Sequence, residues 1–257
     1  MRVFARLVNF LSHPRDIGAK VRWRLVLARV QVNNFFTGLG ASSERYVSGS
    51  KALEEIKNRA LVPTDVNDHL VTLFVESVSM TPRLIVELGV RGGESTFVME
   101  RVAALFGSTL VSVDIDECPT SGAYGKSVFV HSDDVEFAGR FPAWCRESGI
   151  DPRIDVLMVD TSHLYDHTIQ EIACWFPHLS KRAKVFFHDT NLRPLVRRRD
   201  GSLGTGWENE RGVIRALERY FDTTFNEEKD FVDLRNGWLI QHHACCSGLT
   251  VLDRVME

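Results

Sequence analysis

The sequence lacks several features that would place it in a specialised class. Its five cysteines are an odd number and never stand as CxxC, so they favour reduced thiols over a disulfide framework or a zinc site. No apolar run approaches the roughly 18–20 residues that a membrane span requires. The first apolar stretch is interrupted by Arg2 and Arg6, unlike a secretory signal. We therefore expect a cytoplasmic protein.

A strong charge excess is also missing. The 31 basic and 34 acidic residues give a formal net charge of -3, which argues against nucleic acid as the main partner. The apolar share of 44% and charged share of 25% exclude disordered, collagen-like and coiled-coil chains. With 257 residues, the chain can bury a sizeable core without disulfides or a structural metal.

The first 36 residues differ from the rest, with seven basic residues against one acidic residue. Apolar residues recur at helical spacing near the start, and a second apolar helix is predicted over 17–36. Two interpretations stay open for residues 1–36: a helix docked on the domain or on a second subunit of a homo-oligomer, or a basic segment on an anionic membrane surface. A Gly/Ser-containing linker over 38–50 and a helix over 51–59 follow. We divide the chain into an N-terminal helical extension and linker (1–63) and one domain (64–257).

From residue 64 the pattern predicts an α/β domain. A helix opens at Thr64 or Asp65, either of which is a good N-cap. Short apolar runs then alternate with helical periods, as in a buried parallel sheet. The predicted strands are 84–88, 110–113, 128–130, 156–159, 185–187, 224–226 and 238–241. The predicted helices are 95–106, 134–147, 165–176 and 210–221. The expected fold is Rossmann-like and doubly wound, with a mostly parallel seven-stranded sheet and helices on both faces.

A glycine-rich loop follows the first of these strands. Gly89, Gly92 and Gly93 permit a tight turn and a close approach of a ligand to the backbone. Ser95 opens the next helix, whose N-terminus offers free N–H donors. The loop therefore predicts a ligand site.

The loop does not match a dinucleotide site. The GxGxxG spacing counted from Gly89 would need glycine at Arg91 and Glu94. Glu87, just before the turn, is poorly placed for a pyrophosphate and suits a ligand with an ammonium group. Both observations count against a nicotinamide-dependent sugar oxidoreductase, which is the first alternative function.

Acidic residues end the next two strands. Asp114 follows the second strand and can accept both ribose hydroxyls, while Asp133 follows the third and can accept an adenine amino hydrogen. Because ligands bind at the carboxyl edge of an open parallel sheet, these residues and the glycine loop predict a nucleoside site.

The segment Glu87-Leu-Gly-Val-Arg-Gly-Gly, followed by Val113-Asp114, resembles motifs I and II of class I S-adenosylmethionine-dependent methyltransferases. The resemblance spans about 64–241. It implies that Gly89 and Gly93 line the methionine part of the cofactor, Asp114 the ribose and Asp133 the adenine.

A second group of polar residues follows the fourth and fifth strands. Asp160 and Asp189 would face one crevice, where two carboxylates repel unless they share a proton or a cation. Mg²⁺ or Mn²⁺ suits carboxylate ligands and leaves positions open for substrate hydroxyls. His163 is placed to take the proton of an attacking alcohol.

Asp160, His163 and the segment Phe187-His-Asp-Thr together resemble the metal-dependent branch that contains macrocin-type sugar O-methyltransferases and cephalosporin hydroxylase-like proteins. This resemblance implies that the first Asp and an acidic pair after the next strand bind Mg²⁺, and that the histidine is the base. His188 stands where the first acid of that pair is expected. It is either a third ligand or a residue that orients one.

These patterns predict S-adenosylmethionine-dependent O-methylation of a sugar hydroxyl, on a glycan, a glycolipid or a glycosylated metabolite, as in polysaccharide biosynthesis. The polar loop over 191–208 is a candidate lid, and Trp207 could stack on a sugar face. Besides the oxidoreductase, a non-catalytic cephalosporin hydroxylase-like binding protein remains an alternative.

Overall fold

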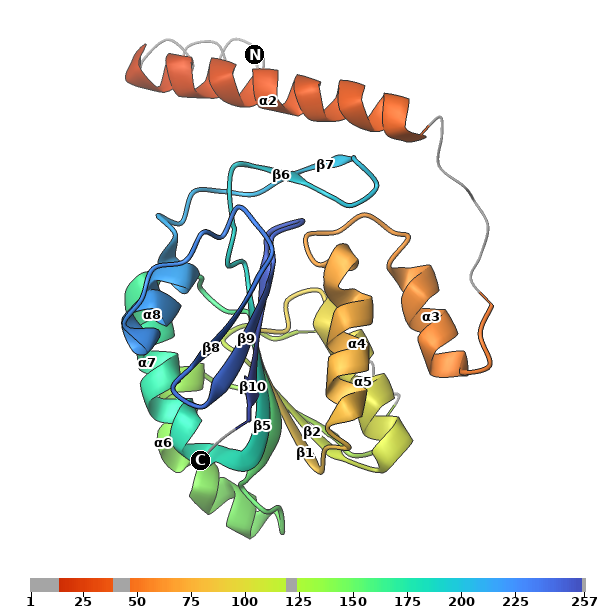
Figure 1. The fold of residues 1–257 in the computed structure, drawn as a ribbon, viewed down its shortest axis with the longest axis vertical. Coiled ribbons are helices and arrows are strands. Elements are labelled where there is room, and N and C mark those ends of the chain that lie inside the picture. Colours follow the sequence, from red (N-terminus) through yellow and green to blue (C-terminus); the bar gives the residue numbers. More distant parts are fainter. Residues whose placement is uncertain (1–13, 39–46, 119–123, 256–257) are drawn as a thin grey trace, which may run out of the picture.

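A computed structural model describes residues 14–38, 47–118 and 124–255, which fold around an eight-stranded sheet (Figure 1). The strand order is β3-β2-β1-β4-β5-β10-β9-β8. Neighbours from β3 to β5 pair in parallel, and β10, β9 and β8 add antiparallel pairs. The strands of this sheet are β1 (Leu84–Leu88), β2 (Thr109–Asp114), β3 (Ser127–His131), β4 (Ile154–Val159), β5 (Leu179–His188), β8 (Phe231–Arg235), β9 (Trp238–His243) and β10 (Leu249–Arg254).

The predicted α/β class is confirmed, but the strand count of seven is wrong by one. The strand expected at 224–226 is a loop, in which Phe225 stacks on the Phe231 ring with centroids 4.9 Å apart. Two strands of this sheet were missed: β8, at its edge, and β10, which inserts between β5 and β9.

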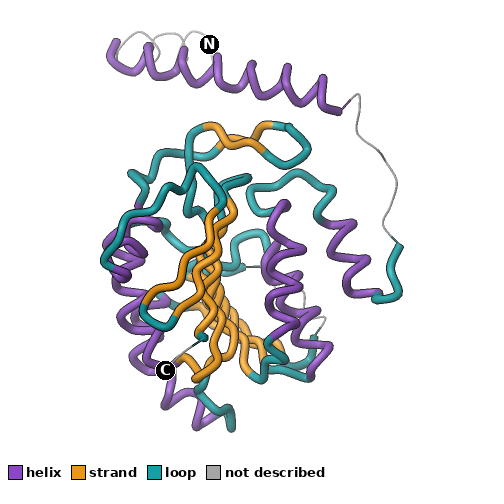
Figure 2. Tube along the Cα trace, viewed as in Figure 1, coloured by secondary structure: helices purple, strands orange, loops and turns teal. Residues whose placement is uncertain are grey.

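Helices cover both faces of the sheet (Figure 2). Helices α3, α4 and α5 lie on one face, and α6, α7 and α8 on the other (Figure 1). Their bounds are α3 (Lys51–Arg59), α4 (Leu70–Ser79), α5 (Glu94–Phe106), α6 (Asp134–Glu147), α7 (Tyr165–Trp175) and α8 (Gly212–Phe221), with 3-10 turns η1 (Asn67–His69) and η2 (Phe176–His178). The helix expected from Thr64 begins only at Leu70, after η1; before it, the Asn67 side chain accepts from the Thr64 N–H at 3.2 Å.

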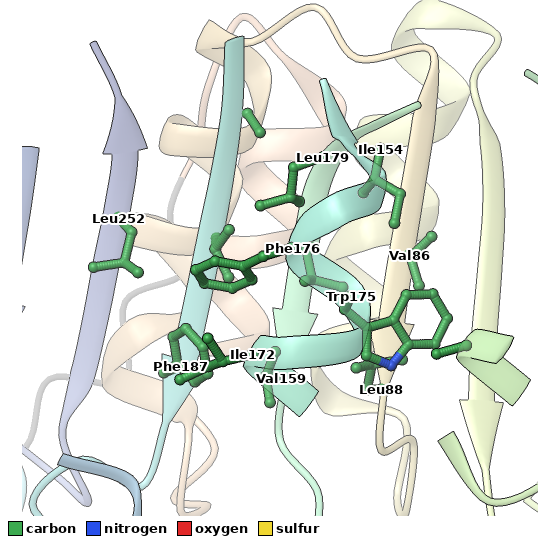
Figure 3. Packing of buried hydrophobic residues seen from close by; sticks show 14 of the residues in the cluster. Val86, Leu88, Ile154, Val159, Ile172, Trp175, Phe176, Leu179, Phe187 and Leu252 are labelled. Carbon is green, nitrogen blue, oxygen red and sulfur yellow. The ribbon is translucent and has the colours of Figure 1, made fainter. Parts of the chain in front are cut away.

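Alternation along β1 decides which side chains reach which face. Val86 and Leu88 join the cluster beneath α6, α7 and α8, where Trp175 packs beside them (Figure 3). Ile85 joins the cluster beneath α3, α4 and α5, which also contains Ile56 of α3. Because successive side chains of a strand point to opposite faces, Glu87 is directed toward α5.

The candidate lid over 191–208 is partly folded. Strands β6 (Leu195–Arg197) and β7 (Leu203–Thr205) form a small hairpin across the carboxyl edge of the sheet. Helix α2 (Pro14–Gly38) lies across this hairpin (Figure 1). The Asn34 amide donates to the Leu203 carbonyl and accepts from the Leu203 N–H, at 2.8 and 2.7 Å. The hairpin therefore links the N-terminal helix to the edge where the site residues lie.

Apolar side chains of α2 remain exposed, with Leu25, Phe35 and Phe36 at 65–67%. No helix in the described ranges is both long and apolar enough to cross a membrane. The basic helix expected at the very start lies outside the described residues. The roles of residues 1–36 and the domain boundary at residue 63 stay predictions.

Candidate functional site

The glycine loop begins where β1 and β4 end side by side. Gly89 has φ +86, and a Cβ at this position would lie 2.0 Å from the carbonyl oxygen of Asp160. Gly93 has φ +76 and is the N-cap of α5. Only glycine adopts this backbone without cost, and at Gly89 only glycine fits against β4.

Asp114 fastens the loop to β2. One carboxylate oxygen accepts from the N–H groups of Val90 and Arg91 at 2.7 and 3.0 Å, and the other accepts from Asp116 at 2.9 Å. Burial alone would raise the pKa of Asp114, but these three donors hold it below its usual value. Asp114 is thus an ionised acceptor at the end of β2.

A cavity of about 310 Å³ opens above these strand ends. Five of the predicted site residues line it: Gly89, Asp114, Asp133, Asp160 and His163. Asp133 also caps α6 by accepting from the Glu136 N–H at 2.9 Å. A second cavity, of about 400 Å³, contains Ser95 and shares Arg91 and Asp160 with the first. The first cavity therefore brings together three of the predicted cofactor residues with Asp160 and His163, whereas Gly93 lines neither cavity.

Glu87 lies behind the loop and is fully buried. Its carboxylate accepts from the hydroxyls of Ser95, Thr96 and Ser112 at 2.7–2.8 Å. Burial raises the pKa of Glu87 to about 7, although the three hydroxyls act in the opposite direction. In this arrangement Glu87 and Ser95 brace the loop from below, and both oxygens of Glu87 are occupied. The alternation of side chains along β1 could have predicted that Glu87 faces α5. It could not have predicted that three hydroxyls donate to its carboxylate.

Replacing Glu87 with glutamine should change how stability depends on pH. The folded chain keeps the proton up to about pH 7, while the unfolded chain loses it near the ordinary value of 4.5. The free energy of unfolding therefore falls as pH rises between these values, by on the order of 3 kcal/mol. Glu87→Gln removes that part of the dependence. Urea unfolding at pH 4.5–8 measures it, with the exposed Glu136→Gln as control. Parallel profiles for wild type and Glu87→Gln would contradict the assignment.

The second group of residues converges at the ends of β4 and β5. Atoms of Asp160, His163 and Asp189 that could bind a metal lie within 4.8 Å of one another. The Nε2 atom of His163 lies 3.2 Å from Asp189 Oδ2, and its Nδ1 atom lies 3.8 Å from Asp160 Oδ1. The buried Oδ1 of Asp189 has no hydrogen-bond partner among the described residues. The two carboxylates, one of them with an unsatisfied buried oxygen, fit a divalent cation beside His163.

His163 and Asp189 both have unusual backbones, with φ of 59 and 57°. Residues at the start of α8 hold the His163 backbone in place. The Asn209 side chain donates to the His163 carbonyl at 3.2 Å, and a Cβ on Gly212 would lie 2.4 Å from that oxygen. Left-handed backbone at non-glycine residues occurs often at functional sites. Sequence spacing gave no indication of it.

His188 is buried behind the two carboxylates. Its Nδ1 atom lies 3.0 Å from Asp160 Oδ1 and 3.4 Å from Asp189 Oδ1. Burial would lower the pKa of His188, but the charges of Asp189 and Asp160 raise it to about 10. The protonated His188 imidazole therefore places a positive charge behind the two carboxylates. Its role as a metal ligand stays a prediction.

The segment after β5 contributes one aromatic side chain to the site. The Trp207 ring centroid lies 6.0 Å from that of His163, and Trp207 is 45% exposed. Arginines of this segment have local partners: Arg193 pairs with Glu228, and Arg198 donates to the Thr64 carbonyl. Trp207 therefore places an aromatic ring of the candidate lid beside His163.

Sequence reasoning missed other residues around the cavities. Arg91 lines both cavities and pairs with Asp65 at 2.6 Å. His167 of α7 lines the first cavity and contacts Asp134 of α6 at 3.0 Å. The contact between α6 and α7 is a tertiary feature, although the four-residue spacing of His167 and Glu171 would have been a signal.

Comparison with known proteins adds independent findings. Residues 86–190 match a family model described as a methyltransferase domain. A Sinorhizobium fredii protein described as the uncharacterized protein y4gI is 31% identical over 129 residues, which are 45% of this chain and 14% of that protein.

Solved structures resemble the fold at low sequence identity. A MycE methyltransferase from the mycinamycin biosynthetic pathway, in complex with Mg and SAH, has a TM-score of 0.50 and 16% identity, over 80% of this chain and 54% of that chain. CalS11, described as a TDP-rhamnose 3'-O-methyltransferase of calicheamicin biosynthesis, has a TM-score of 0.45 and 16% identity, over 83% of this chain and 99% of that chain. The chain spans about half the length of MycE and a small part of y4gI.

Proposed function

We propose that this chain transfers a methyl group from S-adenosylmethionine to a sugar hydroxyl, assisted by Mg²⁺; the match of residues 86–190 to a methyltransferase-domain model supports this. One observation carries the proposal. A single cavity joins the glycine loop, Asp114 and Asp133 to Asp160 and His163. A nucleoside donor and a deprotonated acceptor could therefore meet in it.

The donor end of the site is supported by the loop and the two strand-end acids. Asp114 is an ionised acceptor suited to ribose hydroxyls, and Asp133, which lines the same cavity, would accept from an adenine amino group. The MycE structure of similar fold is a complex with SAH. The family match and the absence of GxGxxG both favour methyl transfer over the oxidoreductase alternative.

The metal would be held by Asp160 and Asp189. Asp160 lines the cavity, the buried Asp189 offers a ligand atom within 4.8 Å of one on Asp160, and the MycE complex contains Mg. His188, behind them, would orient Asp160 through its Nδ1 contact of 3.0 Å. Bound S-adenosylmethionine supplies an electrophilic methyl group, and bound Mg²⁺ lowers the pKa of an acceptor hydroxyl and fixes its direction.

The chain's own residues position the acceptor and move its proton. His163 would accept the hydroxyl proton, since its imidazole lies between Asp160 and Asp189 and borders the cavity. Trp207, half exposed beside His163, offers an apolar face on which a sugar ring can stack. A cytoplasmic location, a homo-oligomer and a sugar-containing acceptor are parts of the same proposal.

A methyl-transfer screen tests the proposed function. Purified chain is incubated with S-adenosylmethionine and free, nucleotide-linked, lipid-linked or glycan-linked sugars, with and without Mg²⁺. Mass spectrometry should detect a gain of one methyl group on a sugar hydroxyl that requires the cation. Methylation confined to acceptors without a sugar would contradict the proposed substrate class, and full activity after EDTA treatment would remove the metal from the account.

Replacing His163 with glutamine separates a base from a ligand or a structural residue. As a general base, His163 contributes about 10²–10⁴-fold to kcat. We expect that loss in steady-state rates, with the affinities for S-adenosylmethionine and Mg²⁺, measured by calorimetry, nearly unchanged. The exposed His131→Gln is a control. A matching loss of metal affinity would instead make His163 a ligand.

A further inference from the structure

A second group of buried metal-ligating side chains lies below the cofactor end of the cavity. Atoms of Asp134, His167 and Glu171 lie within 4.8 Å of one another. Asp134 is in the first turn of α6, while His167 and Glu171 are one turn apart on α7. The Nε2 atom of His167 lies 3.0 Å from Asp134 Oδ1 and 3.7 Å from Glu171 Oε1. Two helices thus present three donors to one point.

Each carboxylate of this group has one oxygen in contact with a neighbour and one buried oxygen that is not. Asp134 is 7% exposed and Glu171 1% exposed. The Oδ2 atom of Asp134 and the Oε2 atom of Glu171 are buried without a hydrogen-bond partner among the described residues. Buried carboxylate oxygens left unpaired in this way require an explanation, and a bound cation supplies one.

We propose that Asp134, His167 and Glu171 form a second divalent metal site, separate from the Asp160 and Asp189 pair and of the Zn²⁺ class. An imidazole nitrogen with two carboxylate oxygens is a donor set that Zn²⁺ accepts, whereas Mg²⁺ prefers oxygen and water. Tetrahedral zinc with bonds of about 2.0–2.1 Å places its ligand atoms about 3.3 Å apart. The two His167 distances, 3.0 and 3.7 Å, bracket that value.

The ion would brace the cofactor cavity. Asp134 and His167 line the cavity, and so does Thr161, whose hydroxyl donates to Glu171 Oε1. Thr161 directly follows Asp160 in the chain. A metal at this point ties α6 to α7 and fixes the backbone that carries Asp160, without taking part in methyl transfer.

The number of Zn²⁺ ions bound per chain tests the site, measured in a variant from which the Asp160 and Asp189 carboxylates have been removed. The double variant Asp160→Asn/Asp189→Asn removes the other carboxylate cluster, and asparagine tolerates the left-handed backbone at position 189. After treatment with a chelator and gel filtration, calorimetry with Zn²⁺ should find one ion per chain in this background. Adding Glu171→Gln or His167→Gln should weaken that binding by at least about 10²-fold. Adding Asp166→Asn, an exposed carboxylate on the same helix, should leave it unchanged.

The outcome is independent of the proposed catalysis. If the background binds no Zn²⁺, or if Glu171→Gln binds as tightly as the background, the second site is refuted whether or not the chain methylates sugars. The visible absorption spectrum of bound Co²⁺ is a second test, and it needs no further variant. Co²⁺ added to the folded background should show the intense visible bands of a four-coordinate site, and a spectrum of the hydrated ion would overturn the proposal. Circular dichroism confirms that each protein is folded.

Discussion

Replacing Asp160 with asparagine is expected to reduce kcat for methyl transfer by at least about 10³-fold. Asp160 lines both cavities, lies 3.0 Å from His188 and, with Asp189 and His163, makes up the candidate metal cluster. Losing the charge stabilisation of a catalytic metal costs several kcal/mol, and each 1.36 kcal/mol is a factor of ten in rate. The residual rate should also be insensitive to added Mg²⁺ or EDTA.

Initial rates at saturating donor and acceptor measure this effect. The matched control is Asp151→Asn, which neutralises an exposed carboxylate before the opposite end of β4. It should keep wild-type turnover. If Asp160→Asn retained both the wild-type rate and its dependence on Mg²⁺, the carboxylate would have no role in catalysis.

The second large effect is expected for Gly89→Ala. The new Cβ would lie 2.0 Å from the Asp160 carbonyl oxygen and 2.7 Å from its carbon, and the residue would keep φ near +86. Overpacking costs about 1–3 kcal/mol and a left-handed backbone about 1–2 kcal/mol. We therefore expect a loss of about 2–5 kcal/mol in the free energy of unfolding. Movement of β1 away from β4 would also displace the loop, so the affinity for S-adenosylmethionine should fall at least about tenfold.

Gly92→Ala provides the control within the same loop. No heavy atom lies within 4 Å of a Cβ built there, and Gly92 is not among the glycines with positive φ. Its unfolding free energy should stay within about 1 kcal/mol of wild type. Urea unfolding and donor calorimetry on both variants give the comparison. Equal behaviour of the two alanine variants would show that the contact between Gly89 and Asp160 does not constrain the site.

The central parallel strands were predictable because β1 and β4 are buried along their whole length. Continuous aliphatic runs marked β1 at its observed bounds, and β4 within two residues. In the antiparallel half only β9, predicted at 238–241, was found, and β8 and β10 were missed. Edge strand β8 is only partly buried, and Thr224 and Phe225, which have strand propensity, lie in a loop because Phe225 packs on Phe231. Tertiary packing overrode propensity at that position.

The sequence predicted those site residues that stand at the ends of strands. Asp114, Asp133 and Asp160 follow successive strands, and the parallel topology carries them to one edge. The position of Glu87 depends on three hydroxyls from α5 and β2. The contact between His167 and Asp134 depends on how α6 packs against α7. Such contacts join segments whose relative placement the sequence alone does not specify.

A crystal structure of the chain with S-adenosylhomocysteine and Mg²⁺ tests the central proposal most directly. It should show the ribose on Asp114, the adenine near Asp133 and the ion between Asp160 and Asp189, with His163 facing the space beside the sulfur atom. A nucleoside bound away from Asp114, or Asp160 and Asp189 turned apart with no ion between them, would contradict it.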